Sequence, residues 1–418
     1  MASLPPSGSY LDSIRSSAHS LRVRSGIKIE SDAITRLLSS PAFISSFQRV
    51  SKVHGLALPL NFPSPLAELN LISVMSLLNF GSGYRVPLHR SAGRGAWDCI
   101  RALVFGMFIS SSADEDDLLS AKGMQNIATG KIAELMGVSI HVEKPHESIP
   151  GVTVGELGGP LYQLVKLITG VLNQTGKLLT EAGYPDLGTF VAESLKEGAR
   201  VKASSQKANA DVETVLEKLV RFLPAFQDMA VVNGQGRSCL YQAPAATNGH
   251  PDVYCFKKAL FLIHAVTVRF GTITSPPFPI CDTSHLPVFS DNVLPSLLIH
   301  LGVMGVSSSS MLSHLFVDTR SPEKLDSLLG HPPALPPDGS NQLPDDGPIV
   351  TSDQAYILRA GAIEACELMF KVANQMEDPT WMKEIRLPDI DMWLWSVAKD
   401  RGDYRKLERF VLRDTVFF

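Results

Sequence analysis

The carboxylate of Asp291 is the first candidate for chemistry in this sequence, because it lies where a helix is predicted to begin. Four leucines after it recur at the spacing of one buried helix face: Leu294, Leu297, Leu298 and Leu301. Pro295 has no N–H to donate and fits only the first helical turn, so the helix is predicted to start near Asn292. The unpaired N–H groups and the positive dipole end at that start favour an ionised carboxylate at Asp291.

Two interpretations of Asp291 follow from its position. Asp, Asn and Ser are the usual residues at helix starts, so Ser290-Asp291-Asn292 fits an ordinary cap. Alternatively, Asp291 is a catalytic carboxylate that stabilises positive charge on a sugar carbon. The sequence pattern by itself favours the cap.

Other side chains that could join such a site are acidic, basic or aromatic: Asp391, Lys257, His54, Phe289, Trp393 and Trp395. Such a set suits hydrolysis of a nucleosidic bond, whose transition state carries positive charge on the ribose C1′ and O4′. A nearby carboxylate stabilises that charge and can orient water, while aromatic walls hold the leaving base.

Each of these residues also has a structural explanation. Asp391 and Trp395 are four residues apart on a predicted helix, so both side chains could face one cleft. Alternatively, Asp391 lies at the start of the helix, and the tryptophans of this helix belong to the core. Lys257 lies at the edge of an apolar helix, where a snorkelling side chain is commoner than a phosphate ligand. His54 could be an ordinary loop histidine.

Several familiar signatures are missing from the chain. It has no P-loop, no dinucleotide-binding glycine motif, no zinc-protease motif, no nucleophile elbow and no kinase motif set. The five cysteines are widely spread and form no C-x-x-C pair, which predicts reduced thiols and argues against a zinc cluster. The acidic run at 113–117 lacks the EF-hand ligand pattern and is better explained as charge at a helix start.

Composition and charge narrow the class of protein further. The 418 residues carry a formal net charge of −4, with Lys and Arg scattered, whereas proteins that grip a nucleic-acid backbone normally present a basic face. No stable nucleic-acid binding is therefore expected. No secretory signal is apparent, and the most apolar segment, 259–268, is too short to cross a bilayer. We expect a cytoplasmic protein, with a nuclear location also open, that makes no membrane contact and is a monomer.

Helical periodicity dominates the chain, which predicts a mainly α fold with few short strands or none. Helices are predicted at 31–38, 66–78, 96–108, 161–172, 190–202, 212–222, 253–270, 353–376 and 390–399, with helical material also starting at Tyr10. Residues 1–9 are predicted to be a mobile tail, and 81–94 a turn with a short strand or loop. Inserted loops are predicted near 141–159, 235–252 and 330–348. Residues 10–418 are expected to form one helical domain, with two lobes and a ligand cleft.

An ordered set of motifs in the C-terminal half resembles the queuosine salvage protein family, the queuosine 5′-phosphate N-glycosylases. The main matches are 256–259, 289–295 with 299–302, and 387–395. Further matches are 173–177, 222–228, Arg359, Glu367 and the closing pair 417–418, with looser ones at His54, 78–80 and 95–97. The resemblance covers most of the chain from about residue 10, excepting the inserted loops. The segment 81–94 and Ser396 depart from the family pattern.

The resemblance implies a helical, DNA-glycosylase-like fold and hydrolysis of queuosine 5′-phosphate to queuine and ribose 5-phosphate, without a metal or organic cofactor. By position, Asp291 would be the catalytic carboxylate, and Phe289 would pack on the 7-deazaguanine base. His54 and Asp391 would contact the ligand. Three further residues are expected to bind substrate: Trp395, Lys257 and Asn292.

A second class of function stays open. The chain could be a non-catalytic helical module that binds a modified nucleoside or tRNA, with Asp291 as a helix cap. A DNA-repair glycosylase is a weaker alternative, because the chain is acidic and has no basic stripe.

Overall fold

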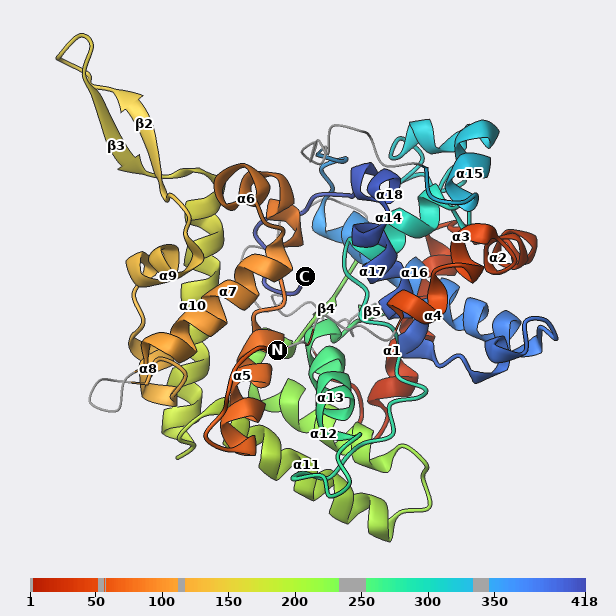
Figure 1. The fold of residues 1–418 in the computed structure, drawn as a ribbon, viewed down its shortest axis with the longest axis horizontal. Coiled ribbons are helices and arrows are strands. Elements are labelled where there is room, and N and C mark those ends of the chain that lie inside the picture. The colour runs from red at the N-terminus through yellow and green to blue at the C-terminus, as the bar shows by residue number, and fades with distance from the viewer. Residues whose placement is uncertain (1–2, 52–55, 57, 112–116, 233–252, 334–345) are drawn as a thin grey trace. The chain divides into compact units, whose positions relative to one another are not determined.

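Helices dominate the computed structural model (Figure 1), which describes residues 3–51, 56, 58–111, 117–232, 253–333 and 346–418. Within these residues, strands occur only as short antiparallel pairs: β1 with β6, β2 with β3, and β4 with β5. The predicted mainly α class is therefore confirmed. No helix in the described ranges combines the length and apolar character that crossing a membrane requires.

The chain divides into two compact units. Unit 1 comprises Met1–Asn61 and Ser194–Leu412, and unit 2 comprises Phe62–Glu193 and Arg413–Phe418. The elements of unit 2 are α5 (Pro65–Leu77), η1 (Ser82–Tyr84), α6 (Arg85–Ala92), α7 (Ala96–Ser110), α8 (Ala121–Asn126), α9 (Thr129–Met136), β2 (His141–Pro145), β3 (Thr153–Leu157) and α10 (Gly159–Glu181). Helix α11 (Leu187–Ser204) begins in unit 2 and ends in unit 1.

Unit 1 contains the C-terminal motifs and most of the remaining helices. From its N-terminal part come α1 (Tyr10–Arg24), β1 (Lys28–Ile29), α2 (Ser31–Leu38), α3 (Pro41–Ile44) and α4 (Phe47–Val50). Its middle part holds α12 (Ala210–Phe222), η2 (Pro224–Phe226), β4 (Met229–Ala230), β5 (Val253–Tyr254), α13 (Lys257–Phe270), α14 (Val293–His300) and β6 (Met304–Gly305). The rest comprises η3 (Val317–Arg320), α15 (Pro322–Leu329), α16 (Ser352–Gln375), η4 (Thr380–Glu384), α17 (Leu387–Asp400) and α18 (Gly402–Lys406).

Helix α16 is the centre of unit 1 and packs against α1, α2, α14 and α17 (Figure 1). It begins with a capping box, in which Thr351 and Gln354 exchange hydrogen bonds between side chain and backbone. On its outer surface, Arg22 of α1 donates two hydrogen bonds of 2.7 Å to Glu364. The buried faces of α14 and α17 are thereby held against a helix that is itself fixed on several sides.

Most predicted helices are confirmed, but the segment 81–94 is a correction. Its glycines predicted a turn followed by a short strand or loop, whereas residues 85–92 form helix α6. Pro87 is the third residue of this helix and lies in the first turn, where its missing N–H costs nothing. Gly93 then ends the helix with a φ of +66°, a conformation that favours glycine.

The helix predicted at 253–270 starts later than expected. Residues 253–254 instead pair with β4, and the helix begins at Lys257 after Phe256, whose φ is +46°. A left-handed conformation is unusual for an aromatic residue and marks a sharp change of chain direction. A periodicity pattern does not detect such a break, because apolar residues recur both before it and after Lys258.

Residues 3–9, predicted to be a mobile tail, are bonded to the body of unit 1. The hydroxyl of Ser7 and the backbone N–H of Gly8 both donate to the Glu217 carboxylate of α12, at 2.8 and 3.2 Å. The Ser3 carbonyl accepts a hydrogen bond of 3.1 Å from the hydroxyl of Tyr254. No local pattern indicates these contacts, because the partners lie more than two hundred residues away in the chain.

The three predicted loop insertions have different outcomes. Residues 141–157 form the antiparallel hairpin β2–β3, with His141 opposite Leu157, and its strand residues are all exposed. The hairpin extends away from the helices of unit 2 in Figure 1. The segment 235–252 and the central part of 330–348 lie outside the described residues.

Close packing of α8 against α10 in unit 2 depends on Gly176. A Cβ at this position would lie 2.4 Å from both the carbonyl oxygen of Ala121 and the backbone nitrogen of Gln125. Both contacts are with backbone, so a side chain at residue 176 would force the two helices apart.

We therefore expect Gly176→Ala to lower the free energy of unfolding by about 3 kcal/mol, because overpacking outweighs the better helix propensity of Ala. Gly130 of α9 is the matched control, since a Cβ at residue 130 would meet no described atom within 4 Å. Gly130→Ala should change stability by less than about 1 kcal/mol. Urea unfolding followed by circular dichroism checks both, and equal effects of the two changes would contradict the close-packing explanation.

Candidate active site

Asp291 lies immediately before α14, as the sequence predicted. The helix begins at Val293 with Asn292 as its N-cap residue, and Pro295 is in the first turn. Asp291 Oδ1 accepts a hydrogen bond of 2.7 Å from the backbone N–H of Val293. The residue is only 5% exposed, and its Oδ2 accepts no hydrogen bond from any described residue. One carboxylate oxygen is thus fixed by the helix start.

Asp391 of α17 lies in the same buried cluster as Asp291. Its Oδ2 accepts a hydrogen bond of 2.6 Å from the backbone N–H of Phe289. Burial, and after it the nearby charge of Asp291, raise the pKa of Asp391 to about 8, while the Phe289 N–H opposes the shift. At neutral pH Asp391 therefore keeps its proton.

Lys257 is the first residue of α13 and is almost completely buried. The alternative that it snorkels to solvent is therefore wrong. Burial lowers the pKa of its amine to about 8, and the charges of Asp291 and Asp391 oppose that shift. Lys257 thus belongs to the same electrostatic cluster as the two carboxyl groups.

A buried ion pair between Asp228 and Arg359 supports this cluster. The guanidinium donates to both carboxylate oxygens, at 2.9 and 2.5 Å, and neither side chain is more than 1% exposed. The hydroxyl of Tyr356 and the backbone N–H of Lys257 also donate to Asp228, at 3.0 and 3.2 Å. Asp228 therefore accepts hydrogen bonds from α13 and α16 at once.

Arg359 also fixes the loop that carries Asp291. Its Nε donates to the backbone carbonyl of Ser290 at 2.8 Å, and the Ser290 hydroxyl donates to the Arg359 carbonyl at 3.2 Å. The backbone N–H of the preceding residue, Phe289, donates to Asp391. The loop is therefore bonded to side chains of both α16 and α17. Asp228 and Arg359 fell within the matched motifs but had no predicted role.

Phe289 is buried between two side chains of α13. Its ring is edge-on to Phe261, with centroids 5.9 Å apart, and is 5.5 Å from the ring of His264. His264 Nδ1 is in turn 2.9 Å from the hydroxyl of Thr283. Phe289 is therefore a buried ring whose backbone N–H bonds Asp391, and His264 is a neighbour that sequence reasoning missed.

Helix α14 carries a polar stripe, defined as Asn292, Ser296 and His300, at intervals of four residues. Each of these side chains bonds the backbone of residues 408–410. Asn292 Nδ2 donates to the Phe410 carbonyl at 2.9 Å, and the Phe410 N–H donates to the Ser296 hydroxyl at 3.1 Å. His300 Nε2 donates to the Glu408 carbonyl at 2.9 Å. The amide nitrogen of Asn292 thus has a structural partner, while its Oδ1 is buried without one among the described residues.

The polar stripe brings Arg409 into the electrostatic neighbourhood of Asp291. Burial lowers the pKa of the Arg409 guanidinium to about 10, and the charge of Asp291 opposes the shift. Its Nη2 donates to the Ala398 carbonyl of α17 at 2.8 Å. Arg409 was not predicted, because nothing in its local sequence distinguishes it from a surface arginine.

The candidate residues of α17 differ in how deeply they are buried and in what they contact. Trp393 is completely buried and donates from Nε1 to the hydroxyl of Ser46 at 2.8 Å, as expected of a core tryptophan. Trp395 is partly exposed, and the ammonium of Lys399 lies 3.4 Å from its ring centroid. Only Asp391 of this segment is placed among the buried charges. His54 lies outside the described residues.

Two further observations complete the site. Within the described residues, no group of His, Cys, Asp and Glu side chains is arranged to hold a metal ion. Cys99, Cys255, Cys281 and Cys366 are buried free thiols, and burial raises the pKa of each. Comparison of the chain with protein-family models and with curated proteins finds no match.

Proposed function

We propose that this protein is an N-glycosidase that hydrolyses queuosine 5′-phosphate to queuine and ribose 5-phosphate, and so salvages queuine for tRNA modification. The observation that carries the reaction type is the buried carboxylate of Asp291, with one oxygen fixed by the Val293 N–H and the other left without a described donor. The ordered resemblance of the C-terminal motifs to the queuosine salvage family supports the substrate.

The reaction needs negative charge next to the ribose carbon that loses its base. As the bond to the base breaks, positive charge develops on C1′ and O4′. An ionised carboxylate in a buried site stabilises that charge more strongly than one in water, and an already fixed carboxylate does not have to reorganise. Asp291 is proposed to supply this charge and to orient the attacking water.

Asp391 and Lys257 are proposed to set the net charge around Asp291 and the substrate. Asp391, with a pKa of about 8, keeps its proton at neutral pH and can donate a hydrogen bond to the substrate. Lys257 is mostly protonated at the same pH and is proposed to offset the negative charge of Asp291 and of the substrate phosphate. Phe289 is proposed to pack on the base, with Asn292 and Trp395 as further contacts.

Incubation of the purified protein with queuosine 5′-phosphate, without added metal, tests the proposal. Mass spectrometry should detect free queuine and ribose 5-phosphate in equal amounts. If the folded protein releases no queuine, the glycosidase proposal is wrong. Calorimetric binding of the intact nucleotide would then support the alternative, a non-catalytic module that binds a modified nucleoside.

We expect kcat/KM to fall as the pH rises above about 8. Asp391 and Lys257 both have pKa values of about 8, so both lose a proton there. Asp391 becomes negative and Lys257 becomes neutral, and both changes make the site less favourable for a phosphorylated substrate. Because the two groups interact, the fall reports on the pair rather than on either residue.

A pH–rate profile with the substrate well below KM measures this effect. Asp282→Asn is a suitable control, because Asp282 is exposed and lies outside the buried cluster. Its profile should match that of the unmodified protein. Activity that stays constant over the ~2 pH units above 8 would contradict the assigned protonation states.

A further inference from the structure

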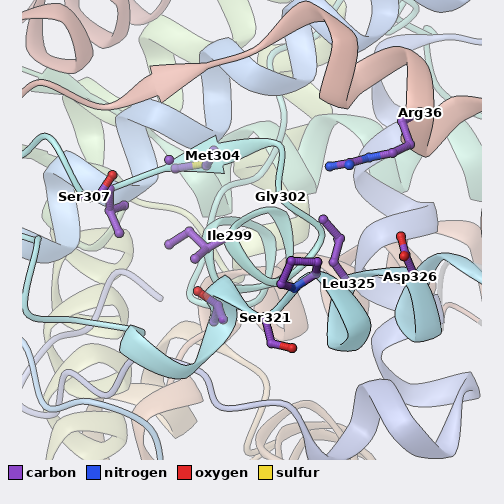
Figure 2. A pocket seen from close by; sticks show the side chains of 12 residues that line it. Arg36, Ile299, Gly302, Met304, Ser307, Ser321, Leu325 and Asp326 are labelled. Atoms are coloured by element: carbon purple, nitrogen blue, oxygen red, sulfur yellow. The ribbon is translucent and has the colours of Figure 1, made fainter.

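A cavity of about 350 Å³ lies at the end of α14 opposite to Asp291. Its walls come from α2, the last turn of α14, β6, η3 and α15, all of unit 1 (Figure 2). Neither carboxyl group of the candidate active site lines it, and neither does Lys257. The cavity is therefore a separate feature that the proposed hydrolysis does not use.

Part of the cavity lining is apolar and suits a small ligand. Ile299 and Met304 are buried there, and Leu325 of α15 adds a half-buried aliphatic side chain. Small-molecule sites usually range from about 300 to 1,000 Å³, so this cavity is at the small end of that range. A nucleotide or a peptide is less suited to it than a metabolite of few atoms.

Arg36 supplies the positive charge of the cavity. Its Nη2 lies 3.2 Å from the position that a Cβ of residue 302 would take, and residue 302 is a glycine with a φ of +73°. Gly302 thus leaves room for the guanidinium to lie over the C-terminal end of α14, whose negative dipole end attracts it. Arg36 makes no hydrogen bond or ion pair with another described residue.

Asp326 of α15 supplies a negative charge to the same cavity. In Figure 2, the guanidinium of Arg36 and the carboxylate of Asp326 occupy the same side of the view, with Leu325 beside them. The hydroxyls of Thr319 and Ser321 donate instead to Phe316 and Glu323, at 2.7 and 2.6 Å. The two opposite charges are therefore available to a ligand, as is the hydroxyl of Ser307.

We propose that this cavity binds a free α-amino acid with an apolar side chain. The ligand carboxylate would pair with the Arg36 guanidinium, which matches carboxylate geometry with two parallel N–H donors. The ligand ammonium would pair with Asp326, and the side chain would contact Ile299, Met304 and Leu325. A phosphorylated ligand would be repelled by Asp326, and a purely apolar one would desolvate both charges without compensation.

Isothermal titration calorimetry with L-leucine tests the site, with two analogues that each lack one charge. 3-Methylbutylamine has no carboxylate, and 4-methylpentanoate has no ammonium group. L-Leucine should bind, and each analogue should bind at least about tenfold more weakly, since each leaves one protein charge unpaired. The absence of L-leucine binding at about 10 mM, or equal binding of all three compounds, would overturn the proposal.

Two variants locate the binding in this cavity. Arg36→Met and Asp326→Asn should each weaken L-leucine binding about tenfold or more. Both positions are exposed, so both variants are expected to fold, which thermal unfolding checks. Arg24→Met is the control, because Arg24 is an exposed arginine of the same unit that does not line the cavity. Binding that survives both cavity variants unchanged would contradict this site. The titration contains no nucleotide, so its result is independent of the proposed glycosidase activity.

Discussion

Asp291→Asn is expected to lower kcat for hydrolysis of queuosine 5′-phosphate by about 10³-fold, the upper range for loss of one preorganised charge-stabilising group. The variant replaces a negative carboxylate by a neutral amide at the point where positive charge develops. Its effect should appear in kcat more than in KM, because the lost interaction is strongest in the transition state. Single-turnover release of queuine measures it.

The same variant should change stability little. An Asn side chain retains an oxygen that can accept the Val293 N–H, as Asp291 Oδ1 does at 2.7 Å. Asp282 provides a closely matched control, because its Oδ1 accepts the N–H of Ser284, also two residues ahead, at 2.9 Å on the exposed surface. Asp282→Asn should leave kcat unchanged. If Asp291→Asn kept activity within about tenfold of the unmodified protein, Asp291 would be a structural cap only.

A second readout distinguishes loss of charge from loss of shape. The negative charge of Asp291 raises the pKa of both Asp391 and Lys257. Asp291→Asn should therefore lower both pKa values, and any residual activity should decline at a lower pH than in the unmodified protein. An unshifted profile would show that the three groups do not interact.

Asp228→Ala is expected to have the largest effect on stability, a loss of about 3–5 kcal/mol in the free energy of unfolding of unit 1. The change leaves the Arg359 guanidinium charged in the protein interior, where it is 0% exposed. It also removes the acceptor for Tyr356 and for the backbone N–H of Lys257. Urea unfolding followed by tryptophan fluorescence reports mainly on unit 1, because three of the four tryptophans lie there.

A double-mutant comparison separates the ion pair from the loss of packing. Adding Arg359→Met to Asp228→Ala removes the uncompensated charge and fills most of the same volume, so part of the stability should return. Arg22→Met is a control at a partly exposed ion pair with Glu364, where the expected loss is at most about 1 kcal/mol. A loss from Asp228→Ala no larger than that of Arg22→Met would show that water reaches the pair.

The features predicted correctly are those that the chain encodes locally. The start of α14 follows from Pro295 and the leucine spacing, and Asp291 follows from that start. The helices predicted at 31–38 and 353–376 are likewise confirmed, as α2 and α16. The prediction for 81–94 was wrong, because the glycines indicate a turn while Pro87, in the first turn of α6, is compatible with a helix.

The features that were missed depend on residues distant in sequence. Asp228 and Arg359 are 131 positions apart, and neither has a local pattern that reveals a buried partner. Lys257 was assigned a snorkelling alternative because a lysine at the edge of an apolar helix usually reaches solvent. Its burial becomes apparent only when α13 is placed against the loop of Asp291 and the start of α17. Arg409 was missed for a similar reason, because it comes near Asp291 through the bonds between the polar stripe of α14 and residues 408–410.

The polar stripe joins α14 to residues 408–410, and these two segments should differ in how well they tolerate substitution. The side chains of Asn292, Ser296 and His300 supply α14's half of the bonds, whereas residues 408–410 supply only backbone atoms. A change of side chain at Glu408 therefore leaves every bond of the stripe intact, while a change at any stripe residue removes one. Sequence drift or redesign should thus be accepted more readily at Glu408 than on α14, with proline at 410 excluded because its N–H is required.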